Sequence, residues 1–218
     1  LVVCGRQGYE QYEEYIKDIE RESGRKVLVC KYSGSNISST MLKVFLEFGI
    51  DCKKYIGEKV LEYIKKNGKP DVIIASSVHP LTLVAGIRIA KKLQIPCICE
   101  IRDLWPEAIF TIGKVKEKSL FGRTLISGEH WIYRNATALI FTKEGDTDYL
   151  KEKKWTTSQG GDIDLSKCYY INNGINLATY QNQLQLEVLD DPDLLDASRF
   201  NVIYAGIIRP VNNVGNLL

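Results

Sequence analysis

Short apolar runs alternate along this chain with segments in which apolar residues recur at helical spacing. The clearest example lies in its middle, where residues 71–75 and 97–101 are strand-like runs, and Leu83, Ile87 and Ala90 between them mark one face of a helix. Short, continuously apolar runs are typical of buried parallel strands. The order strand, helix, strand therefore predicts a βαβ unit.

The same alternation continues on both sides of this unit. Further strands are expected at residues 1–4, 27–31, 138–141 and 169–171. Helices are expected at residues 9–22, at 60–64, at 115–133 with a break near Gly122, and from a Thr142 cap to Leu150. Gly24 and Gly68 are expected to stop the helices before them, and residues 155–167 read as a loop. The chain is thus predicted to have an α/β fold with a mostly parallel sheet.

The composition changes after residue 176. A tight turn is expected at Asn172-Asn173-Gly174, and residues 177–199 are rich in Gln, Asn and Asp. A fresh strand follows at residues 201–205. We therefore expect one domain at 1–176, a linker or surface excursion at 177–200, and the first strand and helix start of a truncated second domain at 201–218. Both ends look cut, so the chain is expected to be a fragment.

Charge and cysteine usage narrow the class of protein. A formal net charge of +2 with 26% charged residues gives no reason to expect a nucleic-acid partner. No run approaches the roughly 18 apolar residues of a membrane-spanning helix. The six cysteines are scattered and predict reduced, buried thiols of a cytoplasmic protein. Cys97 and Cys99 share one strand and are not expected to face one pocket.

Charged residues cluster where the strand at residues 97–101 ends. Arg102 and Asp103 follow it directly, and ligands of open α/β sheets bind at the carboxyl ends of strands. Asp103 could accept a proton from a hydroxyl, while Arg102 could keep Asp103 ionised or bind an anion. Glu107 falls in the first turn of a helix, where a negative charge is favourable, so a structural role could also explain its presence. The alternative is a salt-bridged loop that only orients Trp105.

The preceding strand ends in a second polar group. Ser76, Ser77 and His79 lie between it and a helix whose first turn suits Pro80. A helix start offers backbone donors to a hydroxyl or an anion. The alternative is a serine cap beside an exposed histidine.

Four segments then resemble one family. CEIRDLWPE, RNATALIFTKEGDTDYL, YYINNGIN and VIYAGIIR resemble the group 1 (family 4) glycosyltransferases, in particular the fucosaminyltransferase-like bacterial enzymes that build O-antigen and capsule. The resemblance covers roughly Pro70 to Leu218, whereas the earlier part matches poorly. There, Gly5 to Gly8 could stand at the position of the family's acceptor loop.

The resemblance implies a fold and an activity. The fold is GT-B, in which this chain supplies the Rossmann-like N-terminal, acceptor-side domain and a second domain binds the donor. The activity is that of a retaining, hexosyltransferase-type enzyme, which moves a sugar from a nucleotide-sugar, in particular a UDP-sugar, to a lipid-linked glycan in surface polysaccharide biosynthesis. No metal or other cofactor is implied, and the fragment alone is expected to be inactive.

The resemblance also implies site residues. Asp103 and Arg102 stand where many relatives have a His-Asp pair, so Arg102 replaces the histidine. The donor-side positions are Asn173, Gly174, Gly206 and Arg209, and a cation at Arg209 would stabilise a departing nucleotide. The acceptor-side candidates are Ser76, Ser77, His79 and Glu107.

The implied location is cytoplasmic and peripheral on the inner membrane. The segment Lys114–Arg134 mixes basic and apolar residues, as membrane-surface helices do, although its apolar side could instead pack on the sheet. Two other functions stay open. One is a nucleotide-sugar epimerase of the same fold, and the other is a non-catalytic small-molecule binding domain.

Overall fold

The computed structural model describes residues 17–18, 20–31, 58, 60–77, 79–111, 113 and 115–186, followed by 191–192, 196, 198 and 200–204. The strand expected at residues 1–4, the Gly5–Gly8 loop and the positions Gly206 and Arg209 lie outside these residues. The chain divides into two units, Leu1–Asn172 and Asn173–Leu218, and each is described by itself.

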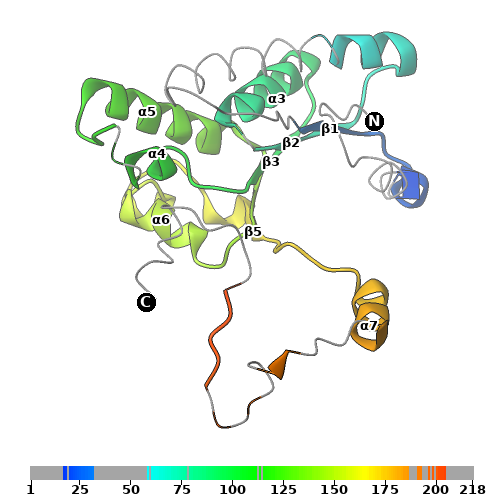
Figure 1. Ribbon diagram of the computed structural model, residues 1–218. Coiled ribbons are helices and arrows are strands. Elements are labelled where there is room, and N and C mark those ends of the chain that lie inside the picture. The colour runs from blue at the N-terminus through cyan, green and yellow to red at the C-terminus, as the bar shows by residue number, and fades with distance from the viewer. Residues whose placement is uncertain are drawn as a thin grey trace. The chain divides into compact units, whose positions relative to one another are not determined.

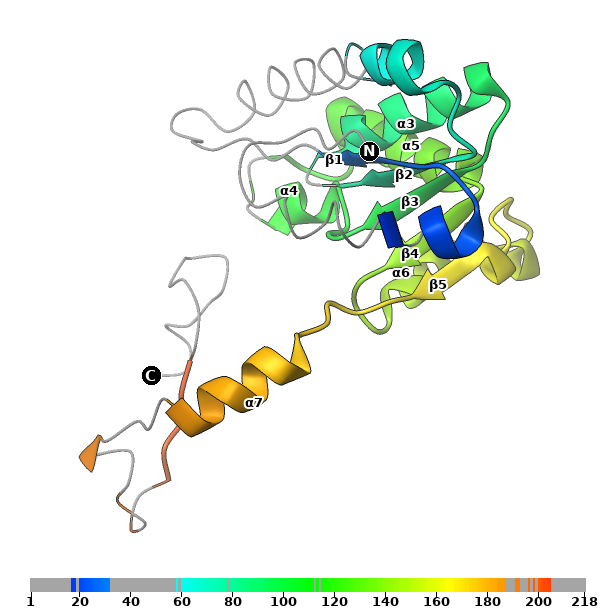
Figure 2. The ribbon, with the colours of Figure 1, turned by 90° about the vertical axis from the view of Figure 1, so that its right-hand side faces the viewer.

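The described strands of the first unit form one parallel sheet. They are β1 (Val27–Lys31), β2 (Val72–Ser76), β3 (Cys97–Ile101), β4 (Ala138–Phe141) and β5 (Cys168–Tyr170). Each strand pairs in parallel with the next in the chain, and Figure 2 shows them following one another from β1 to β5. The predicted Rossmann-like α/β fold with a parallel sheet is confirmed.

Helices connect these strands. They are α3 (Pro80–Leu93) between β2 and β3, α4 (Glu107–Thr111) and α5 (Leu120–Asn135) between β3 and β4, and α6 (Asp146–Glu152) between β4 and β5. Since the strand order follows the chain, right-handed crossovers place the connecting helices on one face of the sheet. Figure 1 shows α3 and α5 together on that face.

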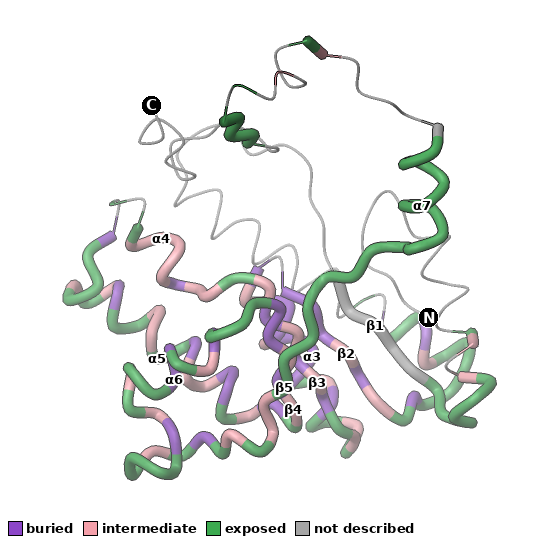
Figure 3. Tube along the Cα trace, turned by 90° about the horizontal axis from the view of Figure 1, so that it is seen from below, coloured by how far each residue is buried: buried purple, intermediate pink, exposed green. Residues whose placement is uncertain are grey.

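The core lies between this face of the sheet and the helices. The side chains of Ile73, Ala75, Cys99 and Leu139 are fully buried in the strands, and Figure 3 shows the buried positions gathered along the strands and the helices that cover them. Helix α3 approaches β2 closely at Gly86, where an added Cβ would lie 2.7 Å from the Cβ of Ala75. A glycine is therefore required for this helix–sheet contact.

Several sequence predictions are confirmed within a residue. The strands β1, β3 and β4 have the predicted bounds, and β2 and β5 begin one residue away from theirs. Gly24 and Gly68 directly follow helical residues, and both glycines have positive φ. Their amides donate to the carbonyls of Glu20 and Ile64, four residues earlier. This is the αL ending that glycine favours.

Two helix starts were predicted wrongly. Helix α5 has no break at Gly122. It begins at Leu120, later than predicted, with Ser119 as its N-cap. The Oγ of Ser119 accepts a hydrogen bond from the Gly122 amide at 3.0 Å. Thr142 does not cap α6, which starts from Gly145. The Thr142 hydroxyl instead donates to the carbonyl of Ile101 on the neighbouring strand. A side chain beside a strand end was thus mistaken for a cap.

The segment predicted as a loop at residues 155–167 contains two short 3₁₀ helices, Thr157–Gln159 and Leu165–Lys167. The expected tight turn at Asn172-Asn173-Gly174 is absent, because these described residues form no turn and Gly174 does not have positive φ.

The directions in which the Cys97 and Cys99 side chains point were also predicted wrongly. Their sulfur atoms lie 4.0 Å apart and both thiols are buried. Residues two apart in a strand point to the same face, since the side-chain period of a strand is two. Both residues are free cysteines of the core.

The second unit includes the helix α7 (Leu177–Leu186). The sequence did not predict it, although Asn176 accepts a hydrogen bond from the Thr179 amide, as an N-cap does. The strand expected at residues 201–205 is not formed over the described residues 201–204. The hydrogen bonds of a strand need a partner strand, and no strand pairing joins residues 201–204 to another described residue.

Candidate functional site

The candidate site lies where neighbouring strands of the sheet end. Hydrogen bonds join the segment after β2 to that after β3, because the Ser77 Oγ accepts from the Arg102 amide and the Ser77 amide donates to the Glu100 carbonyl, both at 3.0 Å. The Thr142 hydroxyl, after β4, donates to the Arg102 carbonyl at 3.4 Å. Parallel pairing thus brings the three predicted strand ends to one edge.

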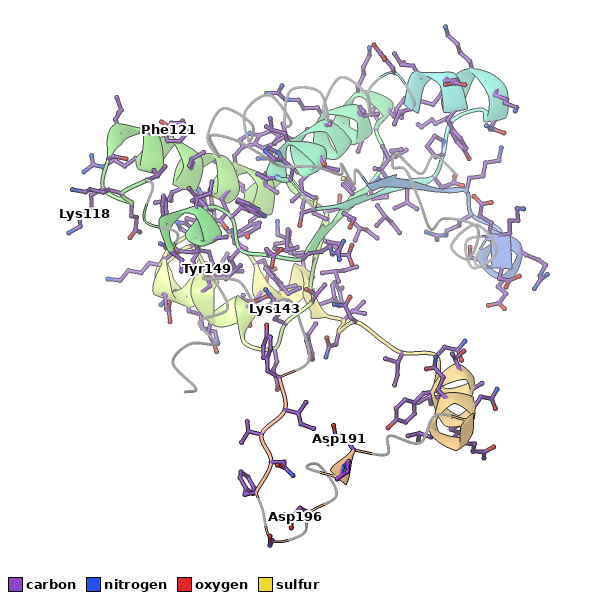
Figure 4. The ribbon with its side chains drawn as sticks, viewed as in Figure 1. Lys118, Phe121, Lys143, Tyr149, Asp191 and Asp196 are labelled. Carbon is purple, nitrogen blue, oxygen red and sulfur yellow. The ribbon has the colours of Figure 1, made fainter. Side chains whose placement is uncertain are left out.

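Asp103 is paired with a cation from the next strand end. The Nζ of Lys143 lies 2.9 Å from the Oδ1 of Asp103, and the two side chains are 59% and 58% exposed. Figure 4 labels Lys143. The sequence assigned the charge-pairing role to Arg102, whereas the structure places Lys143 in contact with Asp103. Asp103 remains open to a ligand on its exposed side.

A second carboxyl group lies close to this pair. Asp146 is the first residue of α6, and its buried Oδ2 accepts no hydrogen bond from the described residues. Burial raises the pKa of the Asp146 carboxyl, nearby Asp103 raises it further, and Lys143 opposes both effects. Lys143 therefore pairs with Asp103 and also favours the charged form of Asp146.

The serine and histidine candidates have different environments. Ser76 and Ser77 are buried, and the Ser76 Oγ has no hydrogen-bond partner among the described residues. His79 is 3% exposed and is the N-cap of α3, since its Nδ1 accepts from the Leu81 amide at 3.1 Å. The alternative of a serine cap beside an exposed histidine is wrong, because the histidine itself is buried and caps the helix. Pro80 occupies the first turn as predicted.

Glu107 begins α4, as the sequence predicted. Its carboxylate lies 2.8 Å from the Nζ of Lys153, which also lies 2.8 Å from the carboxylate of Glu117. These contacts give Glu107 a structural role in holding α4. Its predicted role in acceptor binding stays a prediction.

A buried acid–tyrosine network lies behind the site. Glu129 of α5 is 4% exposed and accepts hydrogen bonds from the hydroxyls of Tyr133, at 2.8 Å, and Tyr149, at 2.7 Å. Burial raises the pKa of Glu129 to about 8 in spite of the two hydrogen bonds, which lower it. Burial likewise raises the pKa of the Tyr133 hydroxyl well above its usual value. At neutral pH the Glu129 carboxyl is therefore mainly protonated.

A small pocket connects this network to the strand ends. Its lining includes Pro80 and Leu83 of α3, Asp103 and Trp105 after β3, and Glu129 and Tyr133 of α5. Asp103 and Glu129 therefore contribute to one pocket from different elements.

The predicted donor-side residues all belong to the second unit. Asn173 and Gly174 are exposed residues of the second unit. Gly206 and Arg209 lie outside the described residues. All four stay predictions from the resemblance.

Neither a metal site nor a membrane span is found in what the structure describes. No group of three or more His, Cys, Asp or Glu side chains there could hold a metal ion. No helix in the described part of the chain has the length and apolar character needed to cross a bilayer.

Sequence reasoning missed Lys143, Asp146 and Glu129. For Lys143 a signal existed, because it stands two residues after β4 just as Asp103 stands two residues after β3. A comparison of the residues at equivalent positions after each strand would have found the Asp103–Lys143 pair. Glu129 gives no local signal, since an acid on an amphipathic helix is ordinarily exposed.

A parallel α/β domain with a polar cluster at the carboxyl edge of its sheet is a common frame for ligand binding. Residues 2–157 match the sequence model of the Glycosyl transferase 4-like domain. Because this match spans more than half of the chain, the protein belongs to that family.

One solved structure shows a weaker likeness. The crystal structure of UGT89C1 from Arabidopsis thaliana in complex with UDP matches with a TM-score of 0.44 and 11% identity, over 85% of this chain and 48% of that chain. This chain thus spans about half the length of that protein. No curated protein sequence matches the chain.

Proposed function

We propose that this chain is the acceptor-side domain of a retaining, hexosyltransferase-type glycosyltransferase. The donor is a nucleotide-sugar, with a UDP-sugar as the first candidate, and the acceptor is a hydroxyl of a lipid-linked glycan in bacterial surface polysaccharide (O-antigen or capsule) synthesis. No metal cofactor takes part. The observation that carries the proposal is the family match over residues 2–157, which contains the polar edge with Asp103.

Asp103 is the residue that acts on the acceptor in this proposal. Its carboxylate takes the proton of the acceptor hydroxyl as the oxygen bonds to the anomeric carbon. The oxygen attacks on the face from which the nucleoside diphosphate departs as its bond to that carbon breaks, so the configuration is retained. Lys143, whose Nζ lies 2.9 Å from the Oδ1 of Asp103, orients the carboxylate. Ser77 contributes indirectly, since it holds the Arg102 amide next to Asp103.

The donor side is proposed from the family resemblance alone. Asn173, Gly174, Gly206 and Arg209 would bind the nucleotide-sugar, and Arg209 would stabilise the departing diphosphate. A cation at the leaving group lowers the barrier only if it is in place in the transition state. Arg209→Ala should therefore reduce kcat as well as donor affinity.

The test is a donor screen with the full-length protein. Thermal shift across common nucleotide-sugars identifies the donor that binds, and sugar transfer to lipid-linked acceptors is then measured for wild type and Asp103→Asn. Transfer that depends on Asp103 supports the proposal. A folded protein that binds nucleotide-sugars but interconverts them, with no acceptor, would show an epimerase instead.

The proposed location is the cytoplasmic face of the inner membrane. Support comes from the start of α5, where Leu120 is 85% exposed and Lys116, Lys118 and Arg123 are exposed around it. Figure 4 labels Lys118 and Phe121 at this end of the helix. Further along α5, Ile132 and Tyr133 are buried in the core. Only the first turns of the helix therefore offer an apolar and basic surface to a bilayer.

Vesicle flotation tests this contact. The chain should float with vesicles that contain anionic phospholipid, and Leu120→Glu should weaken the binding. Leu61→Glu is the matched control, since Leu61 is an exposed leucine (58%) on another helix. Equal binding of both variants and wild type would contradict a contact through α5.

A further inference from the structure

The buried carboxyl group of Glu129 joins α5 to α6. Tyr133, which donates to its Oε1, lies on the same helix, α5, and Tyr149, which donates to its Oε2, lies on α6. Burial and Glu129 raise the pKa of the Tyr149 hydroxyl, and Glu107, the first residue of α4, lies near enough to raise it further. Tyr149, labelled in Figure 4, therefore contacts α5 directly and adjoins the start of α4.

A cluster of ion pairs around Lys153 connects the same segments. Lys153 lies just after α6 and pairs with Glu107 of α4 and with Glu117, both at 2.8 Å. Its Nζ also lies 5.2 Å from the centre of the Tyr149 ring, within the range of a cation–π contact. The segments around α4 and α6 are thus held to each other as well as to α5.

These two segments carry the charged pair of the candidate site. Helix α4 begins four residues after Asp103, and α6 begins three residues after Lys143. Any shift of α4 or α6 relative to α5 would move one member of the pair, because such short connections transmit the displacement. Glu129 also lines the same pocket as Asp103.

We propose that Glu129 is a positioning residue for the Asp103–Lys143 pair, which it fixes through Tyr149 by joining α5 to α4 and α6. This inference rests on the proposed function only in giving the pair a catalytic role. The link itself is a property of the fold and can be tested without activity.

The charge state of Glu129 is part of this arrangement. The groups that face it are Tyr133, Tyr149, Glu107 and Lys153, and Asp103 lines the same pocket. Burial is the largest effect on its pKa and favours the neutral acid. Both tyrosine hydroxyls donate to the carboxyl oxygens of Glu129. Because a tyrosine hydroxyl can also accept, the oxygen and the NH₂ group of a glutamine amide can bond to the same two hydroxyls. Glu129→Gln should preserve the link, whereas Glu129→Leu should break it.

Hydrogen exchange on the chain tests the link. We expect Glu129→Leu to increase amide exchange in residues 103–111 and 143–153, and Glu129→Gln to leave it at the wild-type level. Unchanged exchange in folded Glu129→Leu would overturn the proposal.

Two tyrosine variants cover the case in which Glu129→Leu does not fold. Tyr149→Phe removes the hydroxyl that joins α6 to Glu129 of α5, whereas Tyr133→Phe removes a hydrogen bond within α5 only. Exchange in the two segments should rise in Tyr149→Phe and not in Tyr133→Phe. Equal exchange in both variants would contradict the link.

Kinetics of the full-length protein test the positioning role. Tyr149→Phe and Glu129→Leu should lower kcat about tenfold or more with little change in donor KM, since small misplacements of reacting groups cost rate. Glu129→Gln should restore kcat, and Glu152→Gln, an exposed α6 variant, is the control. Increased exchange in residues 103–111 and 143–153 together with a wild-type kcat would contradict the positioning role of Glu129. Absence of transfer by the wild type would instead refute the proposed function and leave the exchange result to decide the link.

Discussion

Lys143 donates a hydrogen bond from its Nζ to the Oδ1 of Asp103 over 2.9 Å, and this contact joins the end of β4 to the end of β3. Because both side chains are more than half exposed, the pair contributes little to stability. The pair places one carboxylate and one ammonium group side by side at the exposed strand edge.

The first prediction concerns Asp103. In the full-length protein, Asp103→Asn should lower kcat by about 100-fold or more, because an amide cannot accept the proton of the acceptor hydroxyl. The variant should keep the wild-type thermal midpoint, since the side chain is exposed. Transfer rates and thermal unfolding are measured on the same samples. Near-normal turnover would rule out Asp103 as the base.

Lys143→Met gives the second prediction, which separates charge from structure. It should lower the turnover less than Asp103→Asn does, because the Asp103 carboxylate stays in place and loses only its contact with the Nζ of Lys143. Stability should change by less than about 1 kcal/mol. Urea unfolding and transfer rates give the two readouts. Lys143→Arg, which keeps the charge, is the control and should retain the wild-type turnover.

The sheet could be predicted from sequence because its strands are short apolar runs that alternate with helices. Cys97–Ile101 and Ala138–Phe141 were predicted with their observed bounds, because both are short, mostly apolar runs whose buried side chains stand at every second position. The starts of α5 and α6 were missed because caps depend on which backbone groups need a partner. Thr142 looked like a cap, but its hydroxyl reaches a neighbouring strand that local sequence does not reveal.

The candidate site was predictable only in part for the same reason. The sequence indicated Asp103 and Ser77 by their places at strand ends, and the structure joins those segments through the Arg102 amide. Lys143 and Glu129 lie about 40 and 25 residues after Asp103 in the chain, and only the register of the sheet and the packing of α5 bring them near it.

A third prediction tests the close approach of α3 to the sheet. Gly86→Ala should destabilise the fold by about 1–3 kcal/mol, because its Cβ would lie 2.7 Å from that of Ala75. Gly128→Ala on α5 is the matched control, since a Cβ there meets nothing within 4 Å. It should stabilise the protein by about 0.5–1 kcal/mol through helix propensity. Urea unfolding measures both. Equal effects of the two changes would contradict the packing of α3.

The cap of α3 provides the fourth prediction. His79→Ala should cost roughly 0.5–2 kcal/mol, because the Leu81 amide loses its side-chain acceptor. His79→Asn, which can accept the same hydrogen bond, should recover part of the loss. If alanine and asparagine variants unfold at the same urea concentration, the hydrogen bond of His79 does not contribute to stability.

The last prediction follows from the raised pKa of Glu129, which is about 8 in the folded chain against an ordinary value of 4.5. Below pH 4.5 the group is protonated in both the folded and the unfolded chain and adds no pH dependence. Between pH 4.5 and 8 the unfolded chain loses this proton while the folded chain keeps it, so the free energy of unfolding should fall by up to about 1.4 kcal/mol per pH unit from this group. Above pH 8 the contribution levels off.

Glu129→Gln should remove this slope, because an amide does not titrate. Urea unfolding at pH 5, 6, 7 and 8 compares the variant with wild type, and Glu152→Gln controls for the loss of an exposed carboxylate on α6. The difference in unfolding free energy between Glu129→Gln and wild type should grow in favour of the variant as the pH rises. A constant difference across this range would mean that Glu129 is ionised in the folded chain, and that the two tyrosine hydroxyls compensate for its burial.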